Sequence, residues 1–409
     1  MDIQLFTLIV LVAAIIIGFK TNINTGVISL GLAFIVGHFV AGLPFGKIIG
    51  GWPTKLFIML MGMTFIFCIA NVNGTLELLA KKVTRLAKGN NKLLPIIFFV
   101  LCAILSAVGP GPIVVPAIML PIAMEIAKID DIPDMLMATL VIAGSLAGGL
   151  SPLTPSGIVA NTWTAQQGLD LSSNIFFSML AAGTLMGVIY YVLFGGLKLK
   201  GVAKEQTELM NFNGKQKITL AVIGLVVCGI MFFKWDIGLT SLTGAAILLL
   251  IKASDQNKSI AAVPWATLIM VSGVAVLVNV VQLSGGIATL SKMLAALMNE
   301  ITAAPIMAAT GGLMSTASSA MGVVMPTLIP TVPGIVKHMG GTVTASSLIT
   351  GIVVGAHVVT VSPFSTLGAL AMASATDATD TNKFFTKLLI TGMCGVPAAF
   401  LIGLLGFYR

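Results

Sequence analysis

The stretch Ser151-Pro-Leu-Thr-Pro-Ser-Gly157 interrupts a long apolar segment, and the stretch Val361-Ser-Pro-Phe-Ser-Thr-Leu-Gly368 interrupts a second one. Ser151 and Ser362 lie 211 residues apart. Proline has no amide hydrogen and clashes with the preceding helical turn, so both segments are predicted to be helices that break near their middle. Inside a membrane, such irregular backbone is tolerated only where it is buried in protein or lines a cavity.

Composition defines the class of protein around these breaks. Of 409 residues, 57% are hydrophobic and only 9% are charged, whereas an ordinary soluble domain is about 25% charged. This excludes a soluble enzyme and a disordered chain. The uncharged runs last about 17 to 24 residues, which suits helices that cross about 30 Å of hydrocarbon and not the shorter strands of an outer-membrane barrel. The predicted fold class is an all-α polytopic membrane protein.

Other landmarks recur at almost the same spacing as the breaks. Pro116 and Pro326 are 210 residues apart, and Asn174-Ile-Phe-Phe is followed by Asn382-Lys-Phe-Phe after 208 residues. Residues 1–197 and 218–409 are therefore predicted to be two repeats, joined by a cytoplasmic linker at 198–217. Each repeat is predicted to cross the membrane five times, and an odd number of crossings turns the second repeat upside down. Inverted repeats of this kind build many secondary transporters.

Each repeat is predicted to contain scaffold spans, an amphipathic interfacial helix, a re-entrant hairpin, a broken helix and a last span, giving about ten spans and two hairpins. In the first repeat these elements occupy residues 4–72, 74–88, 93–126, 135–163 and 174–197. In the second repeat they occupy residues 218–282, 285–299, 303–336, 345–374 and 384–407. Each hairpin arm is expected to be too short to span the bilayer.

The basic residues indicate the orientation. Most of the 22 lysines and arginines fall in segments that are cytoplasmic if the N-terminus lies outside, as the positive-inside rule requires. The predicted location is the inner (plasma) membrane, with both termini outside. The net charge of +8 then reflects orientation in the lipid bilayer, and no nucleic-acid partner is expected.

The breaks and the hairpin tips carry the candidate site. A helix that begins at midplane presents free amides and a positive dipole end to an anion, and nearby carbonyls and hydroxyls can hold sodium. The breaks supply Ser151, Thr154, Ser156, Asn161, His357, Ser362, Ser365 and Thr366. The hairpin tips supply Ser106, Gly109, Ser315, Thr316, Ser318 and Ser319. Possible sodium ligands are Ser106, Gly109, Ser151, Ser315, Ser319 and Ser362. The alternative interpretation is that small and polar residues only permit close helix packing or a kink.

Titratable residues narrow the chemistry further. No Asp or Glu is placed at midplane by the predicted spans, which disfavours a cation/proton exchanger and suits an anionic substrate. His357 is the titratable residue near the site, and it could bind a carboxylate, take up a proton or only pack. Sodium is favoured as the coupling ion over the proton. Without an HExxH pattern, paired intramembrane aspartates or a Walker A sequence, we expect neither an enzyme nor a cofactor.

The repeated order of interfacial helix, hairpin and broken helix resembles the ion transporter superfamily, which includes the divalent anion/sodium symporters. The run Ala147-Gly-Gly-Leu-Ser-Pro-Leu-Thr-Pro-Ser-Gly157 is similar to the dicarboxylate carrier branch named after the malonate carrier MatC. This resemblance implies a homodimer and an elevator-like movement of the hairpins and broken helices against a scaffold. The Ser-Asn-Thr tips of those symporters are absent here, where the tips read Ser106-Ala-Val and Ser315-Thr-Ala.

The leading hypothesis is a secondary active transporter for malonate or a C4-dicarboxylate, driven by sodium or protons. A second hypothesis is the large permease subunit of a tripartite carrier. A third is a carrier for another anion, such as citrate, gluconate, sulfate or an oxyanion. The sequence leaves the substrate open because the size of the pocket depends on how the hairpins meet.

Overall fold

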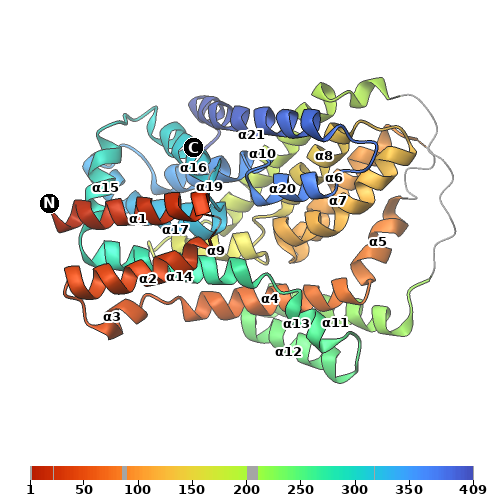
Figure 1. Cartoon of the computed structure of the whole chain (residues 1–409), viewed down its shortest axis with the longest axis horizontal. Coiled ribbons are helices and arrows are strands. Elements are labelled where there is room, and N and C mark those ends of the chain that lie inside the picture. The colour runs from red at the N-terminus through yellow and green to blue at the C-terminus, as the bar shows by residue number, and fades with distance from the viewer. Residues whose placement is uncertain (1, 22, 85–89, 200–210, 317, 409) are drawn as a thin grey trace.

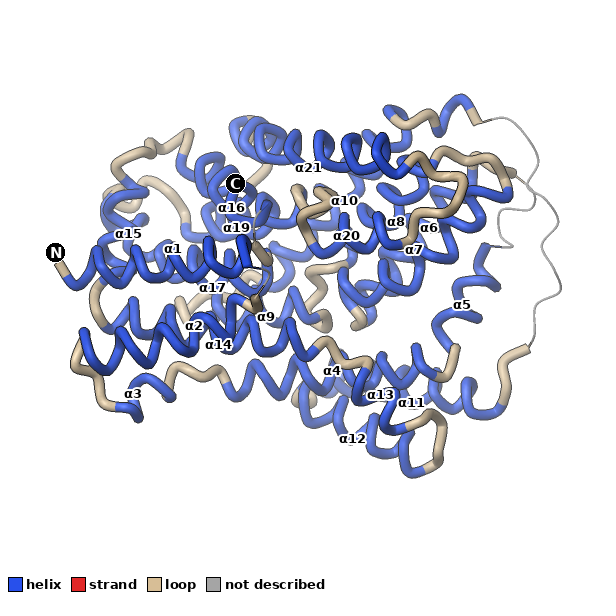
Figure 2. The backbone as a smooth tube through the Cα atoms, in the orientation of Figure 1, coloured by secondary structure: helices blue, strands red, loops and turns tan. Residues whose placement is uncertain are grey.

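The computed structural model describes residues 2–21, 23–84, 90–199, 211–316 and 318–408. These residues form helices and connecting loops, and no β-strand occurs among them (Figure 2). Eight of the helices described are long and apolar enough to cross a membrane. The chain is therefore a polytopic membrane protein built from helices.

The first half contains ten α-helices in the described residues. They are α1 (Ile3–Thr21), α2 (Thr25–Phe34, continued by the π-helix Ile35–Val40), α3 (Phe45–Ile49), α4 (Thr54–Val72), α5 (Thr75–Thr84), α6 (Leu93–Val108), α7 (Gly111–Ile129), α8 (Asp134–Gly148), α9 (Pro155–Ala165) and α10 (Ser172–Leu193). A short 3-10 helix, Gly196–Lys198, follows α10.

The second half contains eleven α-helices in the described residues. Its helices are α11 (Gly214–Phe233), α12 (Ile237–Leu250), α13 (Gln256–Ala261), α14 (Trp265–Leu283), α15 (Gly286–Ala295), α16 (Ala303–Thr316), α17 (Met325–Leu328), α18 (Val332–His338), α19 (Ala345–Val358), α20 (Thr366–Ala373) and α21 (Thr381–Leu404). A π-helix, Ala320–Val324, precedes α17, and a 3-10 helix, Ile329–Thr331, separates α17 from α18. Residues 149–154 separate α8 from α9, and residues 359–365 separate α19 from α20.

The hairpin arms are longer than expected. Helix α7 and the run Ala320–His338 have 19 residues each, and both are long and apolar enough to cross a membrane by length and composition. The expectation that every arm is too short is wrong for these two. Pro116 and Pro121 lie inside α7 without ending it, because neighbouring groups in a membrane protein can satisfy the backbone that proline frees.

The scaffold helices of the two halves pack against each other through glycines. A Cβ atom added to Gly273 of α14 would lie 2.2 Å from the carbonyl oxygen of Gly26 in α2, and one added to Gly62 of α4 would lie 2.5 Å from that of Gly238 in α12. Only glycine allows backbones to approach this closely. Each of these crossings joins a helix of one half to a helix of the other.

Small residues also bring each hairpin against its broken helix. A Cβ atom on Gly148 of α8 would lie 2.0 Å from the Ala103 carbonyl oxygen in α6, and a Cβ on Gly355 of α19 would lie 2.1 Å from that of Ala308 in α16. Gly144 and Gly351 complete a small-xxx-small pair in each helix, the pattern that favours close helix crossing in membranes. Hairpin and broken helix thus form one packed unit in each half.

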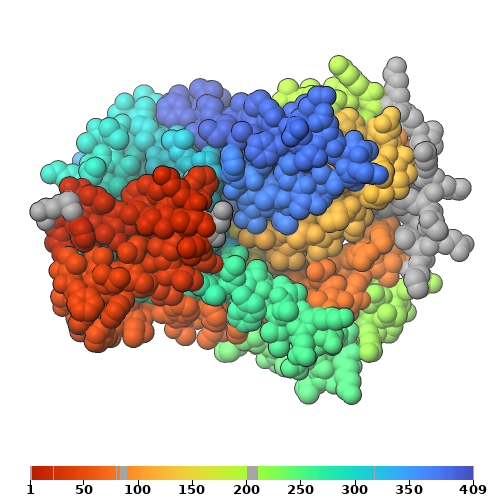
Figure 3. Space-filling view, viewed as in Figure 1, coloured from red at the N-terminus to blue at the C-terminus, as the bar shows by residue number. Residues whose placement is uncertain are grey.

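The amphipathic helices α5 and α15 lie toward opposite ends of the long axis of the molecule (Figure 1). Hairpin helices α6 and α7 lie toward the α5 end, and α16 toward the α15 end. This is the placement that an inverted repeat requires, and the repeat itself stays a prediction. On one face, the N-terminal spans lie beside the C-terminal segments (red and blue, Figure 3), where the ring centroids of Phe19 and Phe364 are 6.4 Å apart.

Candidate functional site

A polar cavity lies where the two broken helices meet the tip of the second hairpin. Predicted site residues that line it are Ser156, Ser318, Ser319, His357, Ser365 and Thr366. The cavity has about 400 Å³ of space, open solvent included. Both halves of the chain therefore contribute residues to one site.

The first break is held by Thr154. Its hydroxyl accepts a hydrogen bond from the Gly157 amide at 3.0 Å, and it lies 2.6 Å from the Gly149 carbonyl oxygen, to which it donates. Thr154 is thus the N-cap of α9, as its residue type favours. Pro155 begins the helix and has no amide hydrogen, so among the first three residues of α9 only the Ser156 amide has no partner in the described structure.

The second break is held differently. The Ser365 hydroxyl donates to the carbonyl oxygens of Thr360 and Ser362 and makes no cap bond to α20. The Gly368 amide instead donates to the Thr360 carbonyl oxygen at 3.2 Å. The amides of Thr366 and Leu367 have no acceptor among the described residues, and both residues line the cavity. The start of α20 therefore offers two free donors and a positive dipole end.

Ser151 and Ser362 shape the breaks and do not line the cavity. Their hydroxyls accept from the amides of Leu153 and Phe364, respectively, each at 3.4 Å. Their carbonyl oxygens lie close to glycines: a Cβ on Gly157 would lie 1.9 Å from that of Ser151, and the corresponding distance for Gly368 and Ser362 is 2.0 Å. The structure thus places these two serines in the backbone of the breaks.

The first hairpin tip is packed tightly. The Ser106 hydroxyl is buried and donates to the Ser145 carbonyl oxygen of α8 at 2.7 Å. Gly109 has a φ of +154°, and a Cβ there would lie 2.3 Å from the Phe67 ring. Neither residue lines the cavity, which this hairpin reaches instead through Pro112 and Ile113.

The second tip contributes Ser318 and Ser319 to the cavity. The Ser318 hydroxyl donates to the Met314 carbonyl oxygen at 2.5 Å, and that of Ser319 accepts from the Gly322 amide at 3.0 Å. Thr316 is half-buried and donates to the Leu313 carbonyl oxygen. The Ser315 hydroxyl is buried without a partner among the described residues, as is the side-chain oxygen of Asn161; neither of these two residues lines the cavity.

The six possible sodium ligands are not gathered around the cavity, since Ser319 is the only one that lines it. In the described part of the chain, no group of three or more His, Cys, Asp or Glu residues could hold a metal ion. Sequence reasoning missed Thr360 and Met321, which also line the cavity. Their positions gave a usable signal, because Thr360 precedes the second break and Met321 follows the serines of the second tip.

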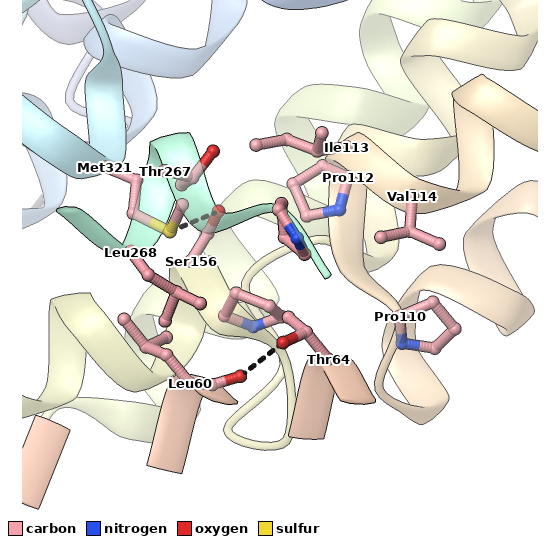
Figure 4. Close-up of a pocket in the computed structure, with 12 residues that line it drawn as sticks. Leu60, Thr64, Pro110, Pro112, Ile113, Val114, Ser156, Thr267, Leu268 and Met321 are labelled. Atoms are coloured by element: carbon pink, nitrogen blue, oxygen red, sulfur yellow. Dashed lines mark hydrogen bonds between the residues drawn. The ribbon is translucent and has the colours of Figure 1, made fainter. Parts of the chain in front are cut away.

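A second, apolar cavity of about 370 Å³ adjoins the polar one and shares Pro112, Ile113, Ser156 and Met321 with it (Figure 4). The Ser156 hydroxyl lies 3.8 Å from the Met321 sulfur at this common wall. A third space of about 980 Å³, open solvent included, shares Ile113, Val114 and Pro264 with the second and is also lined by Asn71 and Glu77 near α5. The three spaces follow one another from the polar cavity toward the α5 end of the molecule.

Two comparisons place this geometry among known proteins. Residues 1–149 match the family model described as dicarboxylate carrier protein MatC N-terminus. No curated protein sequence matches the chain. The crystal structure of the Alcanivorax borkumensis YdaH transporter is similar in fold, with a TM-score of 0.59 and 12% sequence identity over 88% of this chain and 87% of that one. The chain is thus a polytopic membrane protein with the fold of a crystallised transporter, and its first 149 residues are similar to the N-terminus of a dicarboxylate carrier.

Proposed function

We propose that the protein is a secondary active transporter for a small dicarboxylate, malonate or a C4-dicarboxylate. The observation that carries this proposal is the polar cavity at the start of α20. Thr366 and Leu367, whose amides have no acceptor among the described residues, line this space together with the hydroxyl-bearing Ser318 and Ser319. A carboxylate accepts such bonds and is favoured at a helix N-terminus.

The charge of the lining supports an anion. No Asp, Glu, Lys or Arg is among the residues that line the polar cavity. A cation would find no counter-charge there, whereas an anion is compensated by backbone and hydroxyl dipoles. The match of residues 1–149 to a dicarboxylate carrier model supports a dicarboxylate within this class. Membership of the ion transporter superfamily is part of our proposal.

We further propose that the inverted repeats work as a homodimeric elevator in the inner membrane, with both termini outside. The proposed scaffold is the first three spans of each half, which include the glycine-packed helices α2, α4, α12 and α14, and the moving part contains the hairpins and broken helices. Sodium is the proposed coupling ion because neutral oxygens can hold it without a buried carboxylate. The buried Ser315 hydroxyl, which has no partner among the described residues, supports a sodium site near the second tip.

The decisive test is uptake by the purified chain alone in proteoliposomes. Labelled malonate and succinate should accumulate when an inward sodium gradient is imposed, with no added subunit. Uptake that appears only with a small membrane subunit and an external binding protein would identify a permease subunit of a tripartite carrier. Uptake of citrate, gluconate, sulfate or another oxyanion in place of dicarboxylates would reassign the substrate, and accumulation that follows only a proton gradient would reassign the ion.

The proposed topology has its own test. Gln166 and Asn211 are exposed and lie on either side of α10. Single cysteines at these two positions should react with a membrane-impermeant reagent from opposite faces of the membrane. Reaction of both from the same face would contradict the five crossings of the first half, and the inverted repeat with them.

A further inference from the structure

We propose that His357 accepts a hydrogen bond from the bound substrate and therefore selects a half-protonated dicarboxylate, a monoanion with one carboxylic O–H. This inference rests on the proposed function and names the form of the substrate that the cavity takes. It follows from the hydrogen bonding of the imidazole ring and from the groups that share the cavity with it.

The position of the ring proton is set by the helix. The Nδ1 atom of His357 lies 2.7 Å from the Val353 carbonyl oxygen. A carbonyl oxygen only accepts hydrogen bonds, so at this distance Nδ1 carries the hydrogen and donates it. In a neutral imidazole the other nitrogen, Nε2, then has a lone pair and no hydrogen.

The lone pair of Nε2 is left for a ligand. The His357 side chain is 97% buried, with 3% of its surface exposed, and the residue lines the polar cavity. Among the described residues Nε2 has no hydrogen-bond partner, so the cavity that His357 lines is the space from which a ligand could reach it. A nearly buried acceptor without a partner is costly unless a ligand or water supplies a donor.

No charged group stands beside Nε2 to change its state. The elements packed against α19 are α10, α16, α17, α18, α21 and the π-helix Ala320–Val324. Their titratable residues are Tyr190, Tyr191, Lys337, His338, Lys383, Lys387 and Cys394. None of these lines the polar cavity. The neutral ring with hydrogen on Nδ1 is thus the form that its surroundings fit.

The two ends of the cavity therefore favour different groups of the ligand. A carboxylate suits the free amides of Thr366 and Leu367, which donate. At His357 a second carboxylate would place its lone pairs against that of Nε2, whereas a carboxylic O–H would donate to it. A dicarboxylic acid that binds across both must keep one proton. At neutral pH, where free malonate is mostly a dianion, binding therefore takes up a proton from solution.

The experiment uses the full chain in detergent and titration calorimetry at neutral pH in buffers of different ionisation enthalpy. Malonate should bind with uptake of about one proton. Malonamate, a monoanion whose amide supplies an N–H donor, should bind with no proton uptake. Monomethyl malonate, a monoanion without a donor, should bind about tenfold more weakly than malonamate, as expected when a buried acceptor loses its partner.

The variant His357→Gln replaces the imidazole by an amide that does not titrate and whose NH2 group can donate to a second carboxylate. It should bind malonate with no proton uptake, whereas His38→Gln and His338→Gln should take up the proton as the parent does. Proton uptake near zero for malonate in the parent, together with equal affinity for malonamate and the ester, overturns the inference, and neither measurement depends on the variant folding. If no probe binds the parent and no dicarboxylate is accumulated, the proposed function itself fails.

Discussion

The first break begins α9 with Thr154-Pro155, whereas the second begins α20 with Ser365-Thr366. In the first, the cap hydroxyl bonds the Gly157 amide and proline removes another donor. In the second, the hydroxyl turns back to the Thr360 and Ser362 carbonyl oxygens, so the first amides of α20 stay free. Two breaks of similar composition therefore differ in hydrogen bonding: among the first amides of the following helix, one is free at α9 and two are free at α20.

The two hairpins also differ, in how much of their second arm is buried. In α7, 44% of the most apolar 18-residue window is buried, compared with 78% in the run Ala320–His338. Pro326, Pro330 and Pro333 divide the second arm into short pieces, and its π-helix packs against α14, where a Cβ on Gly322 would lie 2.7 Å from the Met270 sulfur. Helix α7 of the first hairpin instead lines the apolar cavity and the third space described above. The largest of the three spaces described above therefore lies beside α7, near α5.

The largest expected effect on stability concerns a feature that both breaks share, a glycine packed against a serine carbonyl oxygen. Gly157→Leu and Gly368→Leu each place a side chain within about 2 Å of a carbonyl oxygen, and each should lower the free energy of unfolding by about 3 kcal/mol or more. Thermal unfolding in detergent measures this. Gly224→Leu, where a Cβ meets nothing within 4 Å, is the control. A tolerated leucine at either position would show that this break is not fixed by backbone contact.

The next change gives the second break the proline of the first. Thr366→Pro removes a free amide and a hydroxyl from the cavity, so malonate binding should weaken by about 10- to 100-fold. The fold should persist because proline fits the first position of a helix and Ser365 already has extended backbone, with φ −93° and ψ 163°.

Calorimetry with malonate measures the loss. The reciprocal variant Pro155→Thr is the matched control and should bind malonate as the parent does, because α9 is closed by Thr154. Equal loss in both variants would mean that the two breaks share the anion, against the difference drawn above.

A smaller effect on stability should distinguish the hydroxyls of Thr154 and Ser365, the residues that precede α9 and α20. Thr154→Ala loses both an accepted and a donated bond and should destabilise the fold by about 1 to 2 kcal/mol. Ser365→Ala loses only donated bonds and should cost about 0.5 to 1 kcal/mol. The difference in melting temperature between the two variants is the measurement, and a larger shift for Ser365→Ala would reverse the assignment of the capped break.

The smallest effect concerns the ion pair that connects the two regions. Lys128 of α7 lies 2.6 Å from Asp377, which follows α20, and both side chains are partly exposed at 35% and 79%. The hydrogen bond from Lys128 holds the pKa of Asp377 below its ordinary value. The pair therefore stabilises the fold at neutral pH, and its contribution is lost as the pH falls through that lowered pKa.

Lys128→Gln should accordingly lower the melting temperature slightly at neutral pH and low salt. The difference from the parent should shrink at high salt, since exposed pairs are screened, and should vanish in acid where Asp377 is protonated. A difference that grows as the pH falls would contradict the pairing.

Local chemistry made the breaks predictable. Proline and glycine at 151–157 and 361–368 act on the backbone directly, and the structure interrupts its helices at 149–154 and 359–365. The short helices α3 and α13 and the π-helices at Ile35–Val40 and Ala320–Val324 gave no comparable signal, because they depend on packing across the chain. The hairpin arms were underestimated since a proline inside a membrane helix need not end it.

The candidate site was less accessible to the sequence. Six of the fourteen candidates line the polar cavity. The hydroxyls of Ser106, Ser151 and Ser362 instead form hydrogen bonds with backbone groups, and these residues do not line the cavity. A serine or threonine can turn its hydroxyl to a carbonyl or to a cavity, and only the packed structure decides which. The contrast between Pro155 and Thr366 was visible in the sequence, yet its meaning depends on where the Ser365 hydroxyl points.

The glycine crossings of the scaffold determine the order in which the protein can be assembled during synthesis. Helix α2 packs against α14, and Gly26 and Gly273 are 247 residues apart, so this contact cannot form until most of the chain has left the ribosome. The α6–α8 contact, in contrast, closes within about 45 residues, as the pair Ala103 and Gly148 shows. Long-range contacts form late because the chain must lose the entropy of loop closure before the contact can stabilise the fold. The first hairpin unit can therefore pack before the α2–α14 and α4–α12 crossings of the scaffold form.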